Sequence, residues 1–244
     1  MELKDIDIVY FVKEAEANEE LRYSLRSVDK NFPHRKVWIY GGLPAGIYPD
    51  KHVRIAQTGK TKWDRVQNMF RQVCLNNDIA EDFVLFNDDF FAMKPVTNLK
   101  SYCRGTIYEH IIKLERAFGD KPTEYSLQLR NAAKAMEDAG ITCYSYELHL
   151  PMIFNRHKLL EVMGAFPDTH CTRTLYGNYC GLGGETIDDV KVYNTRQEFD
   201  KDGTFLSTQD SVFSDGTEVF KHICDTFPQK SRFEKISLSR KGVL

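Results

Sequence analysis

The chain of 244 residues contains 12% aromatic and 28% charged residues, which excludes a disordered protein and allows a hydrophobic core. Its net charge of −2 excludes a globally cationic surface, so nucleic acid is a possible partner that the charge does not indicate. No apolar run approaches the ~20 residues that span a bilayer. The six cysteines lack metal-binding or redox spacing. We therefore expect a cytoplasmic protein with reduced thiols and no membrane span.

The first quarter of the chain alternates between apolar runs and a helical pattern. Residues 6–12 (IDIVYFV) form an almost continuous apolar run, which predicts a buried strand. Asn18 can cap the helical pattern that follows. Further strands are predicted at 36–42 and near 52–56. The opening is therefore a β-α-β unit.

The same alternation continues along the chain. A helix is predicted over residues 63–74, and FVLF at 83–86 predicts the next buried strand. The stretch 99–140 is polar with a helical pattern, 143–154 returns to strand character, and 166–184 suggests loops that line a pocket. The fold class is therefore α/β, with a mainly parallel, Rossmann-like twisted sheet flanked by helices. Ligands bind such sheets at the carboxyl ends of the strands.

Three polar residues, Asn87, Asp88 and Asp89, directly follow the predicted strand 83–86 and precede two phenylalanines. Adjacent carboxylates repel each other unless a cation relieves the repulsion, and oxygen ligands suit Mg²⁺ or Mn²⁺. Such a metal can bridge a diphosphate and neutralise charge on a leaving nucleotide. A simple turn after the strand explains the same residues about equally well.

The sequence context of these acids resembles a known group of enzymes. FNDDFF (86–91) looks like the acidic motif of GT-A-type sugar-nucleotide transferases, and in particular of the Stealth family of hexose-1-phosphate transferases. DIDIVY (5–10) and ELRYSLRSVDKNFP (20–33) are similar to that family's opening block, and LHLPMIFNR (148–156) resembles its histidine block. A weaker likeness covers 166–184. The resemblance implies a GT-A-like fold.

The opening strand departs from the Stealth pattern. Stealth proteins usually continue with Val-Asp-Gly, whereas this chain reads Val12-Lys13-Glu14. Because that acid is missing, we rank glycosyl transfer ahead of transfer of a sugar phosphate.

The resemblance and the position of the acids together define a candidate site. We expect Asp89 to bind Mg²⁺ or Mn²⁺ with help from Asp88. His149 and Arg173 are the candidates for acceptor activation and phosphate stabilisation, against the alternatives of a core histidine and a surface arginine. The residues expected to contact the nucleotide sugar are Val9, Tyr10, Phe11, Gly41, Lys62, Asn68 and Asn87.

Several other polar residues have simpler interpretations. Arg22 and Arg26 lie one helical turn apart and are expected to make structural ion pairs. Asp188 and Asp189 are interpreted as turn residues. Lys60 is interpreted as a solvated side chain. The basic tail at 227–235 is interpreted as a solvated end rather than a lid over phosphates.

The sequence thus predicts a metal-dependent glycosyltransferase that moves a sugar from a nucleoside-diphosphate sugar, a UDP-sugar first among them, to a hydroxyl. The acceptor is a saccharide or a hydroxylated base, in a bacterial or phage setting. The alternatives are a Stealth-like sugar-1-phosphate transferase and a non-catalytic binding or structural protein. We expect a single domain over 1–244, with a nucleotide-binding half at 1–98 and an acceptor-binding half at 99–244.

Overall fold

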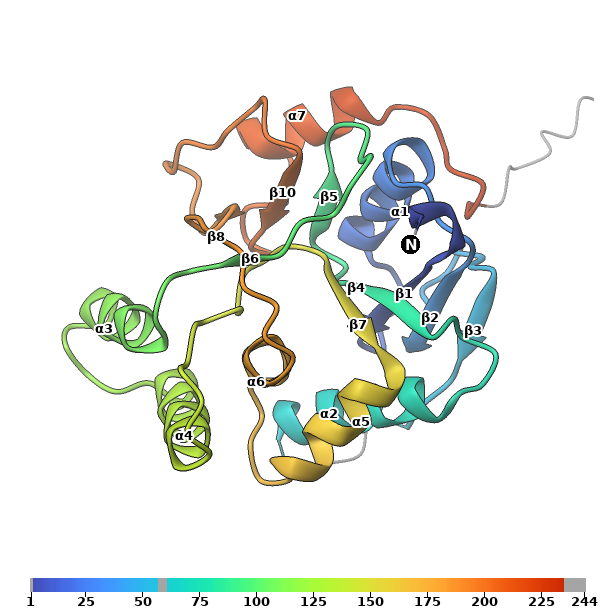
Figure 1. The fold of residues 1–244 in the computed structure, drawn as a ribbon. Coiled ribbons are helices and arrows are strands. Elements are labelled where there is room, and N and C mark those ends of the chain that lie inside the picture. Colours follow the sequence, from blue (N-terminus) through green and yellow to red (C-terminus); the bar gives the residue numbers. More distant parts are fainter. Residues whose placement is uncertain (1, 57–60, 235–244) are drawn as a thin grey trace, which may run out of the picture.

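The computed structural model describes residues 2–56 and 61–234. Its central feature is a five-stranded sheet in the order β3-β2-β1-β4-β7, in which only β7 runs antiparallel to its neighbour (Figure 1). The strands are β1 (Asp7–Val12), β2 (Val37–Gly41), β3 (Lys51–Val53), β4 (Asp82–Phe86) and β7 (Met152–Asn155). This confirms the predicted mainly parallel α/β architecture.

Helices cover both faces of this sheet. Helix α1 (Glu19–Asn31) packs on one face, and α2 (Lys62–Leu75) and α5 (Arg156–Ala165) pack on the other (Figure 1). Strand β1 illustrates why, since Ile8 and Tyr10 join the core under α1 while Val9 joins the opposite core. A strand whose side chains are apolar on both faces needs cover on both faces.

The helices next to the sheet begin with capping residues that the sequence supplies. The side chain of Asn18 accepts a hydrogen bond from the backbone N–H of Leu21, as predicted. Thr61 and Asp64 form a capping box at the start of α2. Both caps follow parallel strands, so α1 and α2 begin at the carboxyl edge of the sheet.

A second, smaller sheet lies beside α1. Its strands are β5 (Phe90–Ala92), β10 (Phe205–Thr208) and β9 (Lys191–Val192), in the order β5-β10-β9. Helix α7 (Glu218–Thr226) shares a hydrophobic cluster with this sheet. Because β5 begins one residue after Asp89, this sheet brings late segments of the chain to the end of β4.

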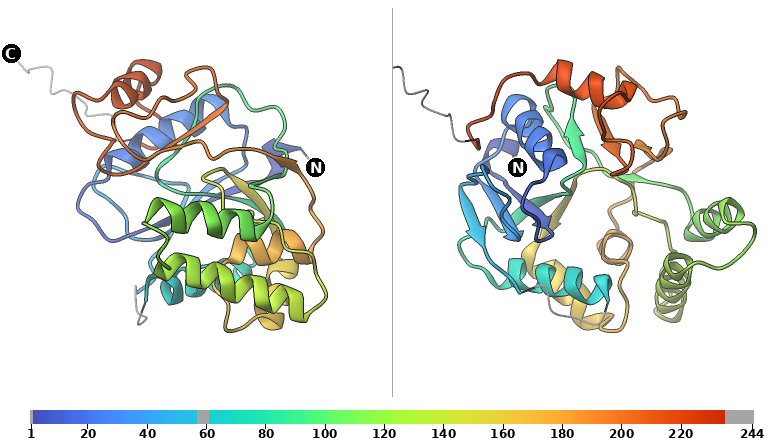
Figure 2. Two further views of the ribbon diagram at one scale, coloured as in Figure 1. Left: turned by 90° about the vertical axis from the view of Figure 1, so that its left-hand side faces the viewer. Right: turned by 180° about the vertical axis from the view of Figure 1, so that it is seen from behind.

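The remaining elements lie outside the five-stranded and three-stranded sheets. Helices α3 (Ile107–Ala117) and α4 (Glu124–Asp138) lie side by side, and α4 contacts α6 (Thr172–Tyr179) (Figure 2). Strands β6 (Tyr102–Cys103) and β8 (Glu185–Thr186) pair in parallel, and a 3₁₀ turn, η1 (Leu3–Asp5), precedes β1. The central sheet contains strands from both sides of the boundary expected at residue 98, since β7 pairs with β4.

Three predictions about local structure need correction. In the stretch 143–154 only β7 is a strand, because the residues before it make no ladder beyond an isolated bridge between Tyr144 and Thr106. The stretch 166–184 is not all loop, since it contains α6. The described tail is solvated only in part, since residues 228–230 and Arg232 are exposed whereas Glu234 is 4% exposed and pairs with Arg26. Lys235 and Lys60 lie outside the described residues.

Other predictions are confirmed. Arg22 and Arg26 make ion pairs with Glu19 and Glu234 and are structural. All six cysteines are free thiols. Across the described residues, no helix combines the length and apolar character needed to cross a bilayer.

Candidate functional site

The three polar residues after β4 lie at the carboxyl edge of the central sheet, as predicted. Asn87, Asp88 and Asp89 line a cleft of about 550 Å³, together with the segment between β1 and α1 and a loop after β10. The lining residues are Lys13, Ala15, Ala17, Asn18, Glu19, Glu20, Asn87, Asp88, Asp89, Asp210 and Phe213. The cleft is strongly acidic, since five of these residues are carboxylates and one is a lysine.

Asp89 is held in place by residues of the small sheet. The ammonium of Lys191 lies 2.7 Å from Oδ2 of Asp89, and the hydroxyl of Ser207 donates to the same oxygen at 3.2 Å. The other oxygen, Oδ1, is buried and has no hydrogen-bond partner among the described residues. A buried carboxylate oxygen without a partner is costly, so it marks a place where a bound cation would stabilise the structure.

Two further carboxyl groups in the cleft carry perturbed pKa values. Burial raises the pKa of Asp88, which accepts a hydrogen bond from Nδ2 of Asn18 at 2.7 Å. Burial also raises the pKa of Glu20, and the charges of Asp89, Asp88 and Asp210 add to the effect, giving about 8. The cations near the cleft therefore do not neutralise all of its carboxylates.

The acidic cleft suits a cation that arrives with its ligand. Within 2–56 and 61–234, no three His, Cys, Asp or Glu side chains converge as a ready-made metal cage. Mg²⁺ needs less than that, because it usually binds one or two carboxylates and completes its shell with phosphates and water. Its ligand distance of about 2.1 Å is also shorter than a hydrogen bond to water. Asp88 and Asp89 fit such a partial site, in which Lys191 competes for one oxygen of Asp89.

His149 forms a hydrogen-bonded pair with Asp189. Nδ1 of His149 lies 2.7 Å from Oδ2 of Asp189, whose Oδ1 accepts the backbone N–H of His149 at 2.9 Å. Asp189 also accepts from Arg104 and Tyr193, both at 3.1 Å. Burial opposes its charged form, but the hydrogen bond and charge of His149 and the charge of Arg104 hold its pKa well below the usual range. The interpretation of Asp189 as a turn residue is therefore corrected.

This pair is linked to the acidic cleft through shared neighbours. The ring of His149 lies 6.2 Å from that of Phe90, the residue after Asp89, and 6.0 Å from that of Tyr193. The ammonium of Lys191 lies 6.0 Å from the ring of Tyr193 and also contacts Asp89. His149 is 29% exposed through its side chain. An ionised Asp189 can only accept a hydrogen bond, so Nδ1 of His149 carries the proton and the lone pair of Nε2 can accept another proton.

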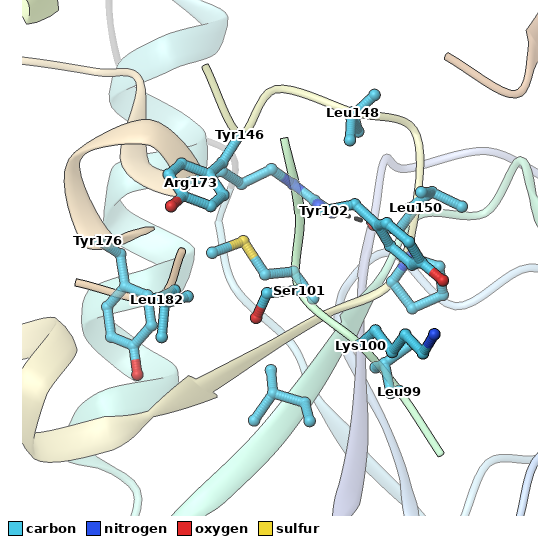
Figure 3. Close-up of a pocket in the computed structure, with 13 residues that line it drawn as sticks. Leu99, Lys100, Ser101, Tyr102, Tyr146, Leu148, Leu150, Arg173, Tyr176 and Leu182 are labelled. Atoms are coloured by element: carbon cyan, nitrogen blue, oxygen red, sulfur yellow. Dashed lines mark hydrogen bonds between the residues drawn. The ribbon is translucent and has the colours of Figure 1, made fainter. Parts of the chain in front are cut away.

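Arg173 does not line the cleft that contains Asp88 and Asp89. It lies in a separate cavity of about 210 Å³, where Nη1 donates to the carbonyl of Leu150 at 2.7 Å (Figure 3). It is 9% exposed, so it is not a surface arginine, and its guanidinium lies 5.6 Å from the ring of Phe90. This position does not support the expected contact with phosphate.

The expected nucleotide-binding positions are only partly brought together. Val9 and Tyr10 are fully buried, and the hydroxyl of Tyr10 pairs with Ser24, so both side chains belong to the core. Phe11 is half-buried against Phe70. Gly41 ends β2 with φ of 104°, a backbone that favours glycine, and its carbonyl accepts from His52. Asn87 alone of the seven lines the acidic cleft.

Two expected residues lie on α2. Lys62 is exposed at the first position of the helix, with its ammonium 4.6 Å from the ring of Trp63. Asn68 is half-buried in the same helix. Neither residue lines the acidic cleft.

Sequence reasoning missed Glu20, Lys191, Ser207 and the pairing role of Asp189. The distances in sequence explain this, because Lys191 lies 102 residues and Ser207 118 residues from Asp89. A partial signal existed, since Lys191 and Asp189 lie in one short polar segment that follows a glycine-rich loop. Only the pairing of β5, β10 and β9 connects them to the acidic motif.

Comparison with known proteins adds a weak structural likeness. The sequence matches no protein-family profile and no curated protein. The fold is similar to the apo form of the glycosyltransferase GlyE from Streptococcus pneumoniae TIGR4, with a TM-score of 0.32 and 9% identity, covering 58% of this chain and 44% of GlyE. Another structure of GlyE has a TM-score of 0.32 and 8% sequence identity, covering 52% of this chain and 43% of GlyE. The chain thus matches less than half the length of GlyE.

Proposed function

We propose that the chain is a metal-dependent glycosyltransferase that moves a sugar from a nucleoside-diphosphate sugar to an acceptor hydroxyl. The observation that carries this proposal is the Asp88–Asp89 pair at the carboxyl edge of β4, in a cleft of about 550 Å³, with one oxygen of Asp89 buried and unpaired. That volume lies within the ~300–1,000 Å³ typical of small-molecule sites.

The charge of the cleft supports a donor that carries its own cation. A bare diphosphate would be repelled by ionised carboxylates such as Asp89. A divalent ion between these carboxylates and the diphosphate turns repulsion into attraction, and Asp88 and Asp89 are the residues that would hold it. When bound, such an ion stabilises the charge that develops on the departing nucleotide.

His149 supplies the base that the proposed reaction requires. Its Nε2 accepts the proton of the acceptor hydroxyl as the oxygen attacks the anomeric carbon, and the bond from that carbon to the diphosphate breaks. Asp189 keeps the ring in the matching tautomer and stabilises the imidazolium that forms. Mg²⁺ or Mn²⁺ remains the expected cofactor, with a saccharide or hydroxylated base as acceptor.

The test is nucleotide release from a panel of UDP- and GDP-sugars with Mn²⁺. We expect the wild-type protein to release nucleotide only with the metal, and Asp89→Asn to lower the rate about 10²-fold or more. Asp202→Asn is the matched control, because its side chain is 95% exposed and pairs only weakly with Lys94. Asp88→Asn, which leaves the Lys191 ion pair intact, is expected to act like Asp89→Asn.

The released nucleotide identifies the reaction. Glycosyl transfer or donor hydrolysis releases a nucleoside diphosphate, whereas transfer of a sugar phosphate releases a nucleoside monophosphate and supports the Stealth-like alternative. Undiminished turnover by Asp89→Asn contradicts the metal role. If no donor gives turnover or raises the melting temperature in the presence of Mn²⁺, the chain is a structural or binding protein and the enzyme proposal is wrong.

A further inference from the structure

A second cavity lies at the same edge of the sheet, beyond β7. It has a volume of about 210 Å³ and is separate from the acidic cleft. Most of its wall is apolar, including Leu99, Leu148, Leu150, Met152 and Leu182 (Figure 3). For comparison, an engineered apolar cavity of about 150 Å³ binds benzene.

Two tyrosines of the lining, Tyr146 and Tyr176, have hydrogen-bonded hydroxyl groups. The hydroxyl of Tyr146 donates to the carbonyl of Gly183 at 2.9 Å, and that of Tyr176 accepts the backbone N–H of Asn155 at 2.7 Å. Their aromatic rings remain as walls of the cavity. The lining therefore resembles a ligand site, in which apolar and aromatic surface surrounds few polar groups.

Arg173 is the buried charged residue of this lining, whereas Lys100 is exposed. It is 9% exposed and extends across the cavity toward Leu150, whose carbonyl accepts from Nη1 (Figure 3). Nη2 has no hydrogen-bond partner among the described residues. Burial lowers the pKa of Arg173, and the charge of Glu147 compensates only part of that effect. A buried cation with a free donor favours an anionic partner.

We propose that this cavity binds a small monocarboxylate with a compact apolar ring or branched body, whose carboxylate pairs with Arg173. The buried guanidinium of Arg173 matches one negative charge, whereas the second charge of a dianion would lie among leucines, because Lys100 is exposed. The cavity has room for a single six-membered ring with its carboxylate. None of the residues that line this cavity lines the acidic cleft, so the proposal does not depend on the proposed glycosyl transfer.

Calorimetric titration with benzoate, with the neutral ring analogue benzyl alcohol and with inorganic phosphate tests the proposal. We expect the wild-type protein to bind benzoate about tenfold or more tightly than benzyl alcohol or phosphate. Arg173→Met is expected to lose the preference for benzoate. Arg156→Met is the matched control, because Arg156 is 8% exposed but does not line this cavity, and it is expected to keep the preference.

A second variant keeps the test decisive if Arg173→Met does not fold. Leu182→Trp fills the cavity from a half-buried position and leaves Arg173 in place. We expect it to weaken benzoate binding about tenfold or more. The proposal is overturned if the wild-type protein does not bind benzoate, if phosphate binds as tightly, or if either variant binds benzoate with unchanged affinity.

Discussion

The carboxylate of Asp189 accepts hydrogen bonds from Arg104, His149 and Tyr193. Its neighbour Asp188 has a fully exposed side chain and only a 3.8 Å contact with Lys113. The two residues look alike in sequence, yet among the described residues only Asp189 pairs with a histidine. Local sequence could not separate them, because the distinction depends on which side chain faces a segment 40 residues away.

These two aspartates allow a matched comparison. If His149 is the base of the proposed reaction, Asp189→Asn removes the charge that orients and stabilises it, and kcat is expected to fall about 10²-fold. The KM for the donor should change little, because Asp189 does not line the acidic cleft. Asp188→Asn should behave as wild type in the same steady-state assay. Equal kcat values for the two variants would contradict the proposed role of His149 as the base.

Elements with strong local patterns were predicted well, and elements defined by packing were not. The apolar runs of β1, β2 and β4 and the cap at Asn18 identified the strands and α1. Helix α6 was missed because its sequence, TRTLYGNY, is rich in poor helix formers. Its first six residues are all buried, so tertiary packing stabilises a helix that intrinsic propensity does not favour.

Close packing at the end of β2 supports a test at this scale. A Cβ atom at Gly42 would lie 2.6 Å from the carbonyl oxygen of Lys13, in the segment that borders the acidic cleft. We expect Gly42→Ala to lower the free energy of unfolding by about 1–3 kcal/mol, because backbone has to move. At Gly164 in α5, a new Cβ would have no atom within 4 Å, so Gly164→Ala should raise the free energy of unfolding by about 0.5–1 kcal/mol. Urea unfolding measures both, and similar values would contradict this packing.

At the scale of the whole molecule, folding gathers acids from separate segments into one cleft. Glu20 comes from α1, Asp88 and Asp89 follow β4, and Asp210 follows β10. Thr208 donates to Glu20 at 2.8 Å and so ties α1 to the small sheet. A cluster of this kind links the stability of the fold to pH.

The sign of that link follows from Glu20. Its pKa rises from 4.5 in the unfolded chain to about 8 in the fold, so the folded state binds more protons between these values. The stabilisation linked to Glu20 is fully present below about pH 4.5 and is lost as pH rises through about 8. Over this range the free energy of unfolding falls by on the order of 2 kcal/mol, after allowance for solvent screening. Urea unfolding from about pH 5 to about pH 9 should show this decline. Glu20→Gln should flatten it and Glu19→Gln should not; an equal slope in both variants would contradict the assignment.

The order of strands and helices over residues 6–86, and the position of Asn87, Asp88 and Asp89 at the end of a buried strand, could be predicted from the amino-acid sequence. These features depend on residues close together in the chain, whose hydrophobic period and capping groups can be read directly. Only the tertiary structure decided that Lys191 meets Asp89, that Asp189 orients His149, and that Arg173 lines a different cavity. The physical reason is that these contacts require strand pairing and packing between segments tens of residues apart, which no local pattern encodes.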